Sequence, residues 1–258
     1  MKYKAEFSNV CESQDKYNPT GLEQASCYHA LGHLLMYVTQ ADIPKSLGLC
    51  KELAIKPNRD MSQVCSDGVF MQIFQPLEPE DFALVKGKEV KKEDLSLFCR
   101  KFDGAKRGSC WSEGWPLFAA ELKKPAGLVK YCGAAAPEER DRCYSALFYV
   151  LTAQFGFDVQ KVQTFCTGLP EDRRGQCFAN AASRMIETDY RNISKSVSLC
   201  VAGSPFDKEN QCFKELLMYS TYNFHPKSEE FLKLCNSLPA PWNERCLHGD
   251  RTLSLLQE

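Results

Sequence analysis

The sequence predicts an all-α protein: an α-solenoid of about seven helix-turn-helix repeats of about 34 residues, stapled by disulfides. Two observations carry this prediction, a repeating cysteine pattern and apolar residues at helical spacing beside those cysteines. From Cys99 onward, successive cysteines are alternately 11 or 12 and 22 or 23 residues apart, so the pair returns every 33 to 35 residues. That period is the length of one helical hairpin, and such hairpins bury their apolar faces by stacking on their neighbours.

Each repeat is expected to hold two helices, called helix A and helix B here. Helix A follows a cysteine directly, as over 144–151, where apolar residues recur at helical spacing. Helix B ends at the next cysteine, as over 159–166, and Asp158 is suited to cap its N-terminus. Asp42 and Asn192 are comparable caps in other repeats.

The loop after helix B carries proline in several repeats, which prevents the helix from continuing. An arginine also precedes the next helix A cysteine by three residues in three repeats, as Arg107, Arg140 and Arg174. These side chains either bond the carbonyl groups at the end of helix B or face water. For any single one of them, the solvent-facing alternative is favoured.

The fourteen cysteines fit seven pairs, and no two are closer than 11 residues, which disfavours the Cys-x-x-Cys sites of zinc, redox and haem proteins. One disulfide pattern joins the ends of a hairpin, such as Cys143 to Cys166, and strands Cys11 and Cys246. The other joins consecutive cysteines across the loop, such as Cys166 to Cys177, and strands none. We favour the second, while fourteen buried free thiols are the alternative to both. The predicted disulfide residues are Cys11, Cys27, Cys50, Cys65, Cys99, Cys110, Cys132, Cys143, Cys166, Cys177, Cys200, Cys212, Cys235 and Cys246.

Seven disulfides predict an oxidising compartment, either extracellular, periplasmic or in a secretory lumen. The start of the chain lacks the apolar core of a signal peptide, so we expect that an export signal has been removed. No stretch approaches 18 consecutive apolar residues, so no membrane span is expected. The 32 basic and 33 acidic side chains are balanced, which disfavours nucleic acid as a partner.

In period, helix pairing and cysteine phase over residues 11–250, the chain resembles the disulfide-rich tetratricopeptide and Sel1-like solenoids. It lacks the Trp, Leu-Gly and Tyr spacing of the tetratricopeptide signature. The resemblance implies one helical-repeat domain over 1–258, acting as a secreted or periplasmic scaffold that recognises a protein or peptide on its concave helical face. We expect a monomer without enzymatic activity, although a self-associating structural protein is another hypothesis.

His29 and His33 offer an alternative function, because their spacing of four places both imidazoles on one helical face, as in metal-binding helices. The chain has four histidines in all, so two in one helix are notable. A zincin helix requires glutamate directly after the first histidine, whereas this chain has Ala30, so hydrolysis is not expected. The competing interpretation is that both rings bond neighbouring groups, with Gly32 allowing another helix to approach closely. No cofactor other than a transition metal is expected.

Two further features are candidates for ligand binding. Tyr219, Tyr222 and Trp242 lie off the predicted apolar stripe, and aromatic side chains often anchor binding surfaces. The interval from Cys65 to Cys99 is longer than the others by a charged, proline-containing loop around 75–94. Insertions of this kind either project from a solenoid and bind ligands or serve as solvated spacers.

Overall fold

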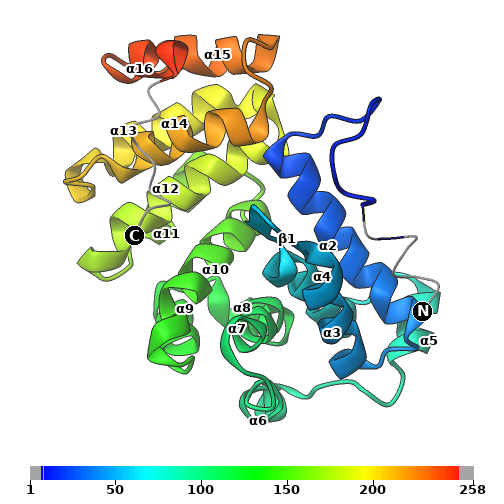
Figure 1. The fold of residues 1–258 in the computed structure, drawn as a ribbon. Helices are drawn as coiled ribbons and strands as arrows, with labels where there is room; N and C mark the ends of the chain where they lie inside the picture. The colour runs from blue at the N-terminus through cyan, green and yellow to red at the C-terminus, as the bar shows by residue number, and fades with distance from the viewer. Residues whose placement is uncertain (1–6, 8, 250–258) are drawn as a thin grey trace. The chain divides into compact units, whose positions relative to one another are not determined.

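The computed structural model describes residues 7 and 9–249, and it is an all-α helical-repeat protein (Figure 1). The α-helices are α2 (Gly21–Val38), α3 (Ile43–Ala54), α4 (Ser62–Phe74), α5 (Pro79–Val85), α6 (Leu95–Cys99), α7 (Gly104–Glu113), α8 (Ala119–Leu122), α9 (Pro125–Gly133), α10 (Arg140–Gln154), α11 (Val159–Thr167), α12 (Glu171–Thr188), α13 (Ile193–Gly203), α14 (Gln211–Asn223), α15 (Glu229–Ser237) and α16 (Trp242–His248). Short 3-10 turns lie at η1 (Lys92–Asp94), η2 (Trp115–Phe118), η3 (Pro137–Glu139), η4 (Tyr190–Asn192) and η5 (Ser204–Phe206). No helix in this part of the chain is long and apolar enough to cross a membrane.

Consecutive cysteines are joined, as the favoured pattern predicts, and every pair named below except Cys11–Cys27 links two successive helices. In six disulfides the two Cα atoms are 5.3 to 5.6 Å apart, within the range that an unstrained disulfide requires. These pairs are Cys11–Cys27, Cys50–Cys65, Cys99–Cys110, Cys166–Cys177, Cys200–Cys212 and Cys235–Cys246. Cys132 and Cys143 are disulfide-bonded as well, so no described cysteine is a free thiol. A chain whose cysteines are all oxidised fits an oxidising compartment.

Two of the three predicted helix caps are confirmed. The Asp42 side chain accepts a hydrogen bond from the backbone N–H of Lys45, and Asp158 accepts one from Lys161. Asn192 precedes α13, but its side chain makes no cap hydrogen bond. The prediction is wrong there because the Asn192 amide donates to the Met185 carbonyl oxygen instead.

The three predicted arginines lie in the first turns of α7, α10 and α12, and two of them bond carbonyl groups at or just past the end of helix B, although the sequence favoured a solvent-facing position for each. Arg174 Nε donates to the Leu169 carbonyl oxygen at 2.9 Å, just past the end of α11. Arg140 Nη2 donates to the Gly133 carbonyl oxygen at 3.2 Å, at the end of α9. The last carbonyl groups of a helix lack partners within it, so Arg140 satisfies one of them at Gly133, whereas Arg174 bonds the loop that follows α11. Arg107 instead forms ion pairs with two glutamates of η3.

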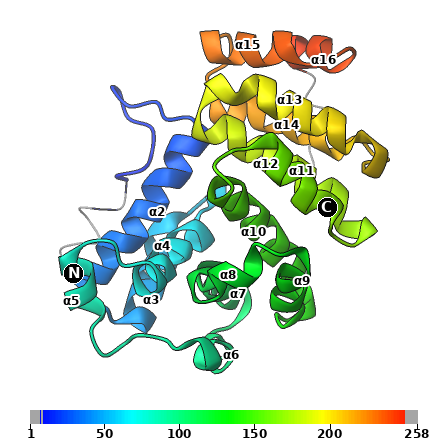
Figure 2. The same cartoon turned by 180° about the vertical axis from the view of Figure 1, so that it is seen from behind.

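The described chain divides into two compact units. The first comprises described residues within 1–19, 23–121 and 133–143, and Figure 2 shows its helices α2, α3 and α4 packed together. Fully buried side chains of these three helices, among them Leu35, Leu53 and Phe70, form its core. Strands β1 (Ile55–Lys56) and β2 (Arg59–Asp60) pair as a small antiparallel hairpin between α3 and α4. The predicted insertion around 75–94 is partly helical, since it contains α5.

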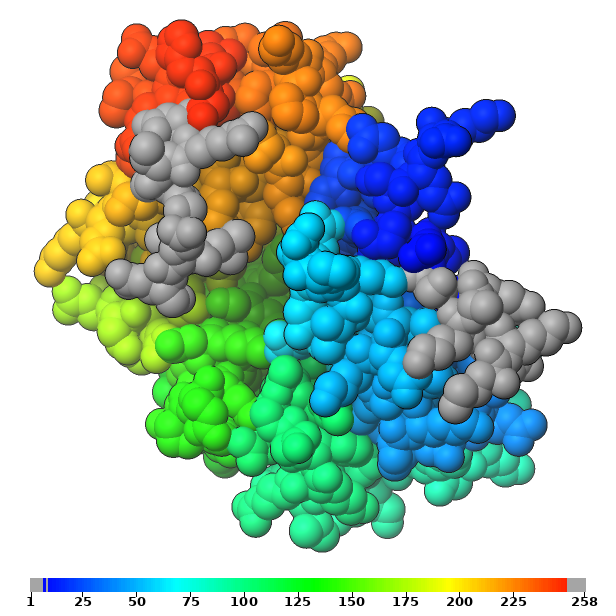
Figure 3. Space-filling view, in the orientation of Figure 1, coloured from blue at the N-terminus to red at the C-terminus, as the bar shows by residue number. Residues whose placement is uncertain are grey.

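The second unit comprises described residues within 20–22, 122–132 and 144–258, and α12 is its central helix. Small side chains of α12, such as Ala179 and Ala182, are fully buried where α13 and α14 pack against it. Gly203 of α13 lies against the Phe178 ring so closely that an added Cβ would stand 2.7 Å from it. The space-filling view shows one face of this unit, which runs from green through yellow and orange to red toward α16 (Figure 3).

Candidate functional site

Helices α2 and α4 approach each other unusually closely, and the contact is made by two glycines. A Cβ built on Gly32 would stand 2.1 Å from the Cys65 carbonyl oxygen, and one built on Gly68 would stand 2.0 Å from the His29 carbonyl oxygen. No other residue type fits either position without moving a helix backbone. The expectation that Gly32 permits a close helix approach is therefore confirmed.

This close approach brings the two predicted histidines against α4. His29 Nε2 and His33 Nε2 are 3.3 Å apart, and the ring centroids are 5.1 Å apart. The Sδ atom of Met71 lies 3.2 Å from His29 Nε2. The three side chains are half-buried, and His29 Nε2 faces a donor atom of each of the other two.

A chain of hydrogen bonds fixes the orientation of His33. Gln72 Nε2 donates to Asp81 Oδ1 at 2.6 Å, and a carboxylate can only accept, so the amide nitrogen of Gln72 must face Asp81. Gln72 Oε1 then faces His33 Nδ1 at 2.6 Å and must receive its proton. In the neutral ring, His33 Nε2 is therefore unprotonated and directs its lone pair toward His29.

The carboxylate that begins this chain belongs to α5, within the predicted insertion. Asp81 Oδ2 accepts the backbone N–H groups of Leu77 and Glu78, each at 3.1 Å, and its other oxygen also accepts the Tyr37 hydroxyl. The hydrogen bond from Tyr37 contributes most to lowering the pKa of Asp81 to about 2, and the same bond raises the pKa of Tyr37 to about 12. Asp81 is thus ionised over the physiological range and keeps Gln72 in one orientation.

The second imidazole is held as the neutral ring. Burial is the main cause that lowers the pKa of His29, and the neighbouring His33 lowers it further, whereas Asp67 acts in the opposite direction. Asp67 is itself paired with Arg142, whose Nη2 lies 2.6 Å from Asp67 Oδ1. Neutral imidazole is the form that binds metal ions.

The distances at this site fit a metal ion. Two nitrogen ligands about 2.0–2.1 Å from a metal at the tetrahedral angle are about 3.3–3.4 Å apart. The Nε2 atoms of His29 and His33 are separated by 3.3 Å. Within residues 7 and 9–249, no group of three or more His, Cys, Asp and Glu side chains is arranged to hold a metal. A third ligand to the two histidines from these described residues would therefore be of another residue type.

The predicted aromatic candidates are separated by the fold. Tyr219 and Tyr222 lie on α14, half-buried, with their rings edge to face at 5.5 Å. Trp242 opens α16, is only 8% exposed, and stacks on the Phe213 ring at 5.9 Å, so its indole is a core side chain. It therefore offers little surface to a ligand.

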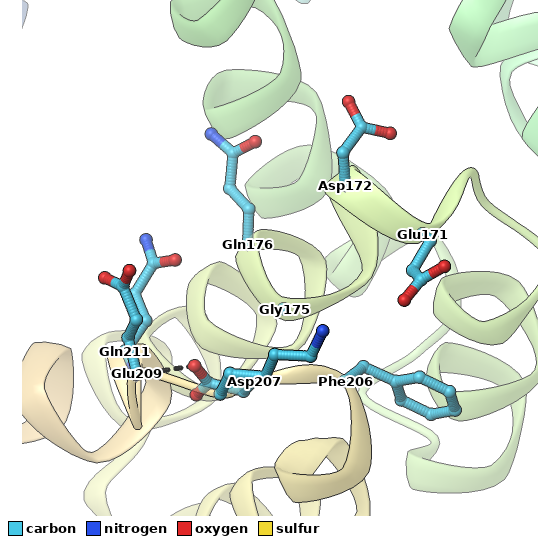
Figure 4. Close-up of a pocket in the computed structure, with 9 residues that line it drawn as sticks. Glu171, Asp172, Gly175, Gln176, Phe206, Asp207, Glu209 and Gln211 are labelled. Atoms are coloured by element: carbon cyan, nitrogen blue, oxygen red, sulfur yellow. Dashed lines mark hydrogen bonds between the residues drawn. The ribbon is translucent and has the colours of Figure 1, made fainter.

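A surface pocket of the second unit, shown in Figure 4, lies between the start of α12 and the loop that precedes α14. Its side chains include the carboxylates Glu171, Asp172, Asp207 and Glu209. Asp207 has a structural role at the start of α14, because its two oxygens accept the backbone N–H groups of Gln211 and Cys212, each at 2.8 Å. One of the acidic side chains that line this pocket is therefore a helix cap, and we do not consider the pocket a candidate ligand-binding site.

Sequence reasoning found the histidines but not the side chains that surround them. Both histidines are separated along the chain by at least 38 residues from Met71, Gln72 and Asp81. The available signal was the second glycine, Gly68, which lies in helix A of the repeat after Gly32. No family model matches the chain, and neither a curated protein nor a solved structure is significantly similar to it. Its function must therefore be argued from its own residues.

Proposed function

We propose that this chain is a metal-binding protein, a disulfide-stapled helical repeat whose His29 and His33 together bind one transition-metal ion. The observation that carries the proposal is the 3.3 Å separation of the two Nε2 atoms, which equals the spacing of two nitrogen ligands on one tetrahedral metal. Metal-binding histidines commonly have their second ring nitrogen held by another group. Gln72 holds His33 in this way.

The proposal places the protein in an extracellular or periplasmic compartment. Where thiols are oxidised, cysteine is lost as a metal ligand, whereas imidazole keeps its affinity. A carrier or store of metal in such a compartment would need ligands of the kind that converge between α2 and α4. The disulfides would then supply the stability, and the histidines the function.

The test compares two double variants that each remove two imidazoles. His29→Ala/His33→Ala removes the proposed ligands, and His225→Ala/His248→Ala leaves them in place while lowering the histidine content equally. Titration with Zn(II), Cu(II) and Cu(I), with metal content measured after dialysis, should give one bound ion for wild type and the control variant. The His29→Ala/His33→Ala variant should retain no bound ion after dialysis. Equal binding by both variants, or no binding by wild type, would refute the proposal.

Recognition of a protein or peptide is a second proposal, which the partly exposed pair of Tyr219 and Tyr222 on α14 favours. Selection of a random peptide library on wild-type protein should enrich sequences that bind it. Those sequences should lose binding to Tyr219→Ala/Tyr222→Ala but keep it to Tyr190→Ala, which removes an exposed ring from another element. Enriched peptides that bind Tyr219→Ala/Tyr222→Ala as tightly as wild type would count against this surface as the binding site.

A further inference from the structure

We propose that the Sδ atom of Met71 is the third ligand of the metal, so that the site takes a soft monovalent ion, Cu(I), in preference to Zn(II). This inference rests on the proposed function, because it assigns the metal that His29 and His33 bind. A thioether is a soft ligand, which favours Cu(I) and its redox-inert analogue Ag(I). No thiolate competes for this role in the described chain, since its cysteines are all disulfide-bonded.

Two of the donor-to-donor distances are close to those expected around one metal ion, namely His29 to His33 and His29 to Met71. A nitrogen about 2.0 Å and a sulfur about 2.3 Å from one metal, at the tetrahedral angle, are about 3.5 Å apart. Met71 Sδ lies 3.2 Å from His29 Nε2, so a movement of about 0.3 Å would bring this pair to the spacing of two ligands on one metal. Methionine has three rotatable bonds, and a shift of that size is within its side-chain freedom.

The protons of the metal-free site mark the position of the ion. His33 Nε2 is an acceptor, because its Nδ1 donates to Gln72. His29 Nε2 therefore supplies the proton between the rings, and the same N–H faces the Met71 sulfur. When a metal binds, the His29 Nε2 proton passes to solvent while Nδ1 takes up a proton from solvent, so no net proton is released and the ring stays neutral. The metal would replace the proton that His29 Nε2 directs at His33 Nε2 and Met71 Sδ.

The charge of the site also favours a monovalent ion. Two neutral imidazoles and a thioether carry no negative charge, and the carboxylate of Asp81 reaches His33 only through Gln72. The cost of transferring an ion from water to a partly buried site grows with the square of its charge. A divalent ion would thus face about four times the cost of a monovalent one, with no carboxylate or thiolate among the three ligands to offset it.

The experiment removes the sulfur alone. Met71→Leu keeps a similar volume, and Met61→Leu is the matched control, since it removes a sulfur from the N-terminal end of the same helix. Cu(I) is delivered anaerobically as its acetonitrile complex, without reductant, and a thiol assay confirms that the disulfides stay intact. Ag(I) and Zn(II) are titrated in parallel. Met71→Ala replaces Met71→Leu if circular dichroism shows that the branched side chain disturbs the fold.

The expected result is that wild type and Met61→Leu bind Cu(I) and Ag(I) more tightly than Zn(II). Met71→Leu should lose at least about tenfold in Cu(I) affinity while its Zn(II) affinity changes by less than about twofold. Unchanged Cu(I) affinity in Met71→Leu, or tighter Zn(II) than Cu(I) binding by wild type, would overturn the inference. Either outcome would leave the proposed function standing if His29→Ala/His33→Ala still abolished metal binding, whereas unimpaired binding by that variant would end both.

Discussion

Replacing Gly68 by alanine should both destabilise the protein and disrupt the histidine site. The added Cβ would stand 2.0 Å from the His29 carbonyl oxygen, whereas ordinary contacts begin near 3.4 Å, so α2 and α4 would have to separate by about 1.4 Å. Overpacking of this kind costs about 1–3 kcal/mol, and the better helix propensity of alanine returns about 0.5–1 kcal/mol. The overlap is with a backbone oxygen, which puts the cost in the upper part of its range, so we expect a net loss of about 1–2.5 kcal/mol, or about 2–10 °C in Tm.

The matched control is Gly48→Ala, also within a helix. No atom lies within 4 Å of the Cβ that this change adds, and the residue is exposed on α3. It should raise the free energy of unfolding by about 0.5–1 kcal/mol. Thermal melts followed by circular dichroism measure both variants, and metal titration should show weaker binding for Gly68→Ala alone. A Gly68→Ala protein as stable as Gly48→Ala, with unchanged metal affinity, would refute the close helix contact.

Three further predictions concern the scaffold. Removing one disulfide by Cys166→Ser/Cys177→Ser should lower the free energy of unfolding by about 3 kcal/mol on the chain-entropy model. Peptide mapping of wild type without reductant should find these two cysteines joined to each other. A different partner for either cysteine would contradict the repeat register. Asp158→Ala should lower the free energy of unfolding, measured with denaturant, by about 1 kcal/mol because it removes a helix cap. Asn192→Ala should lower it by less, since Asn192 makes no cap hydrogen bond, and the reverse order would contradict the cap geometry. Burial raises the pKa of Glu215 to about 7, so the folded chain binds more protons than the unfolded chain between about pH 4.5 and 7. The free energy of unfolding that this group contributes therefore falls as pH rises through that window, and the stability of wild type relative to Glu215→Gln should decline there by up to about 3 kcal/mol. A difference that stays constant with pH would show that Glu215 is not desolvated.

The repeat architecture could be read from the sequence because the cysteines and the helices share one period. The 11-residue spacing of Cys99 and Cys110 is one loop plus parts of two helices, so it fixed which helix ends meet. Caps were partly predictable, since an aspartate before a helix has an isolated backbone N–H within reach, as at Asp158. Asn192 had a competing partner in the preceding helix, and local sequence does not reveal such a competitor.

The histidine site could be predicted only in half. The spacing of His29 and His33 is local and follows from the helical period, so these two residues were identifiable. Met71 reaches them only because two glycines let α2 and α4 cross closely, and that is a property of the packed pair of helices. The role of Asp81 required a further long-range contact, since it lies in an insertion for which the sequence favoured a solvated spacer.

X-ray absorption at the copper edge of wild-type protein loaded with one Cu(I) tests the central claim most directly, because it reports the ligand atoms without any substitution. The account predicts two nitrogen ligands at about 2.0 Å and one sulfur at about 2.3 Å, with the disulfides still intact. A spectrum with nitrogen and oxygen ligands only would exclude Met71, and one dominated by several sulfurs would mean that copper is held elsewhere, by reduced cysteines.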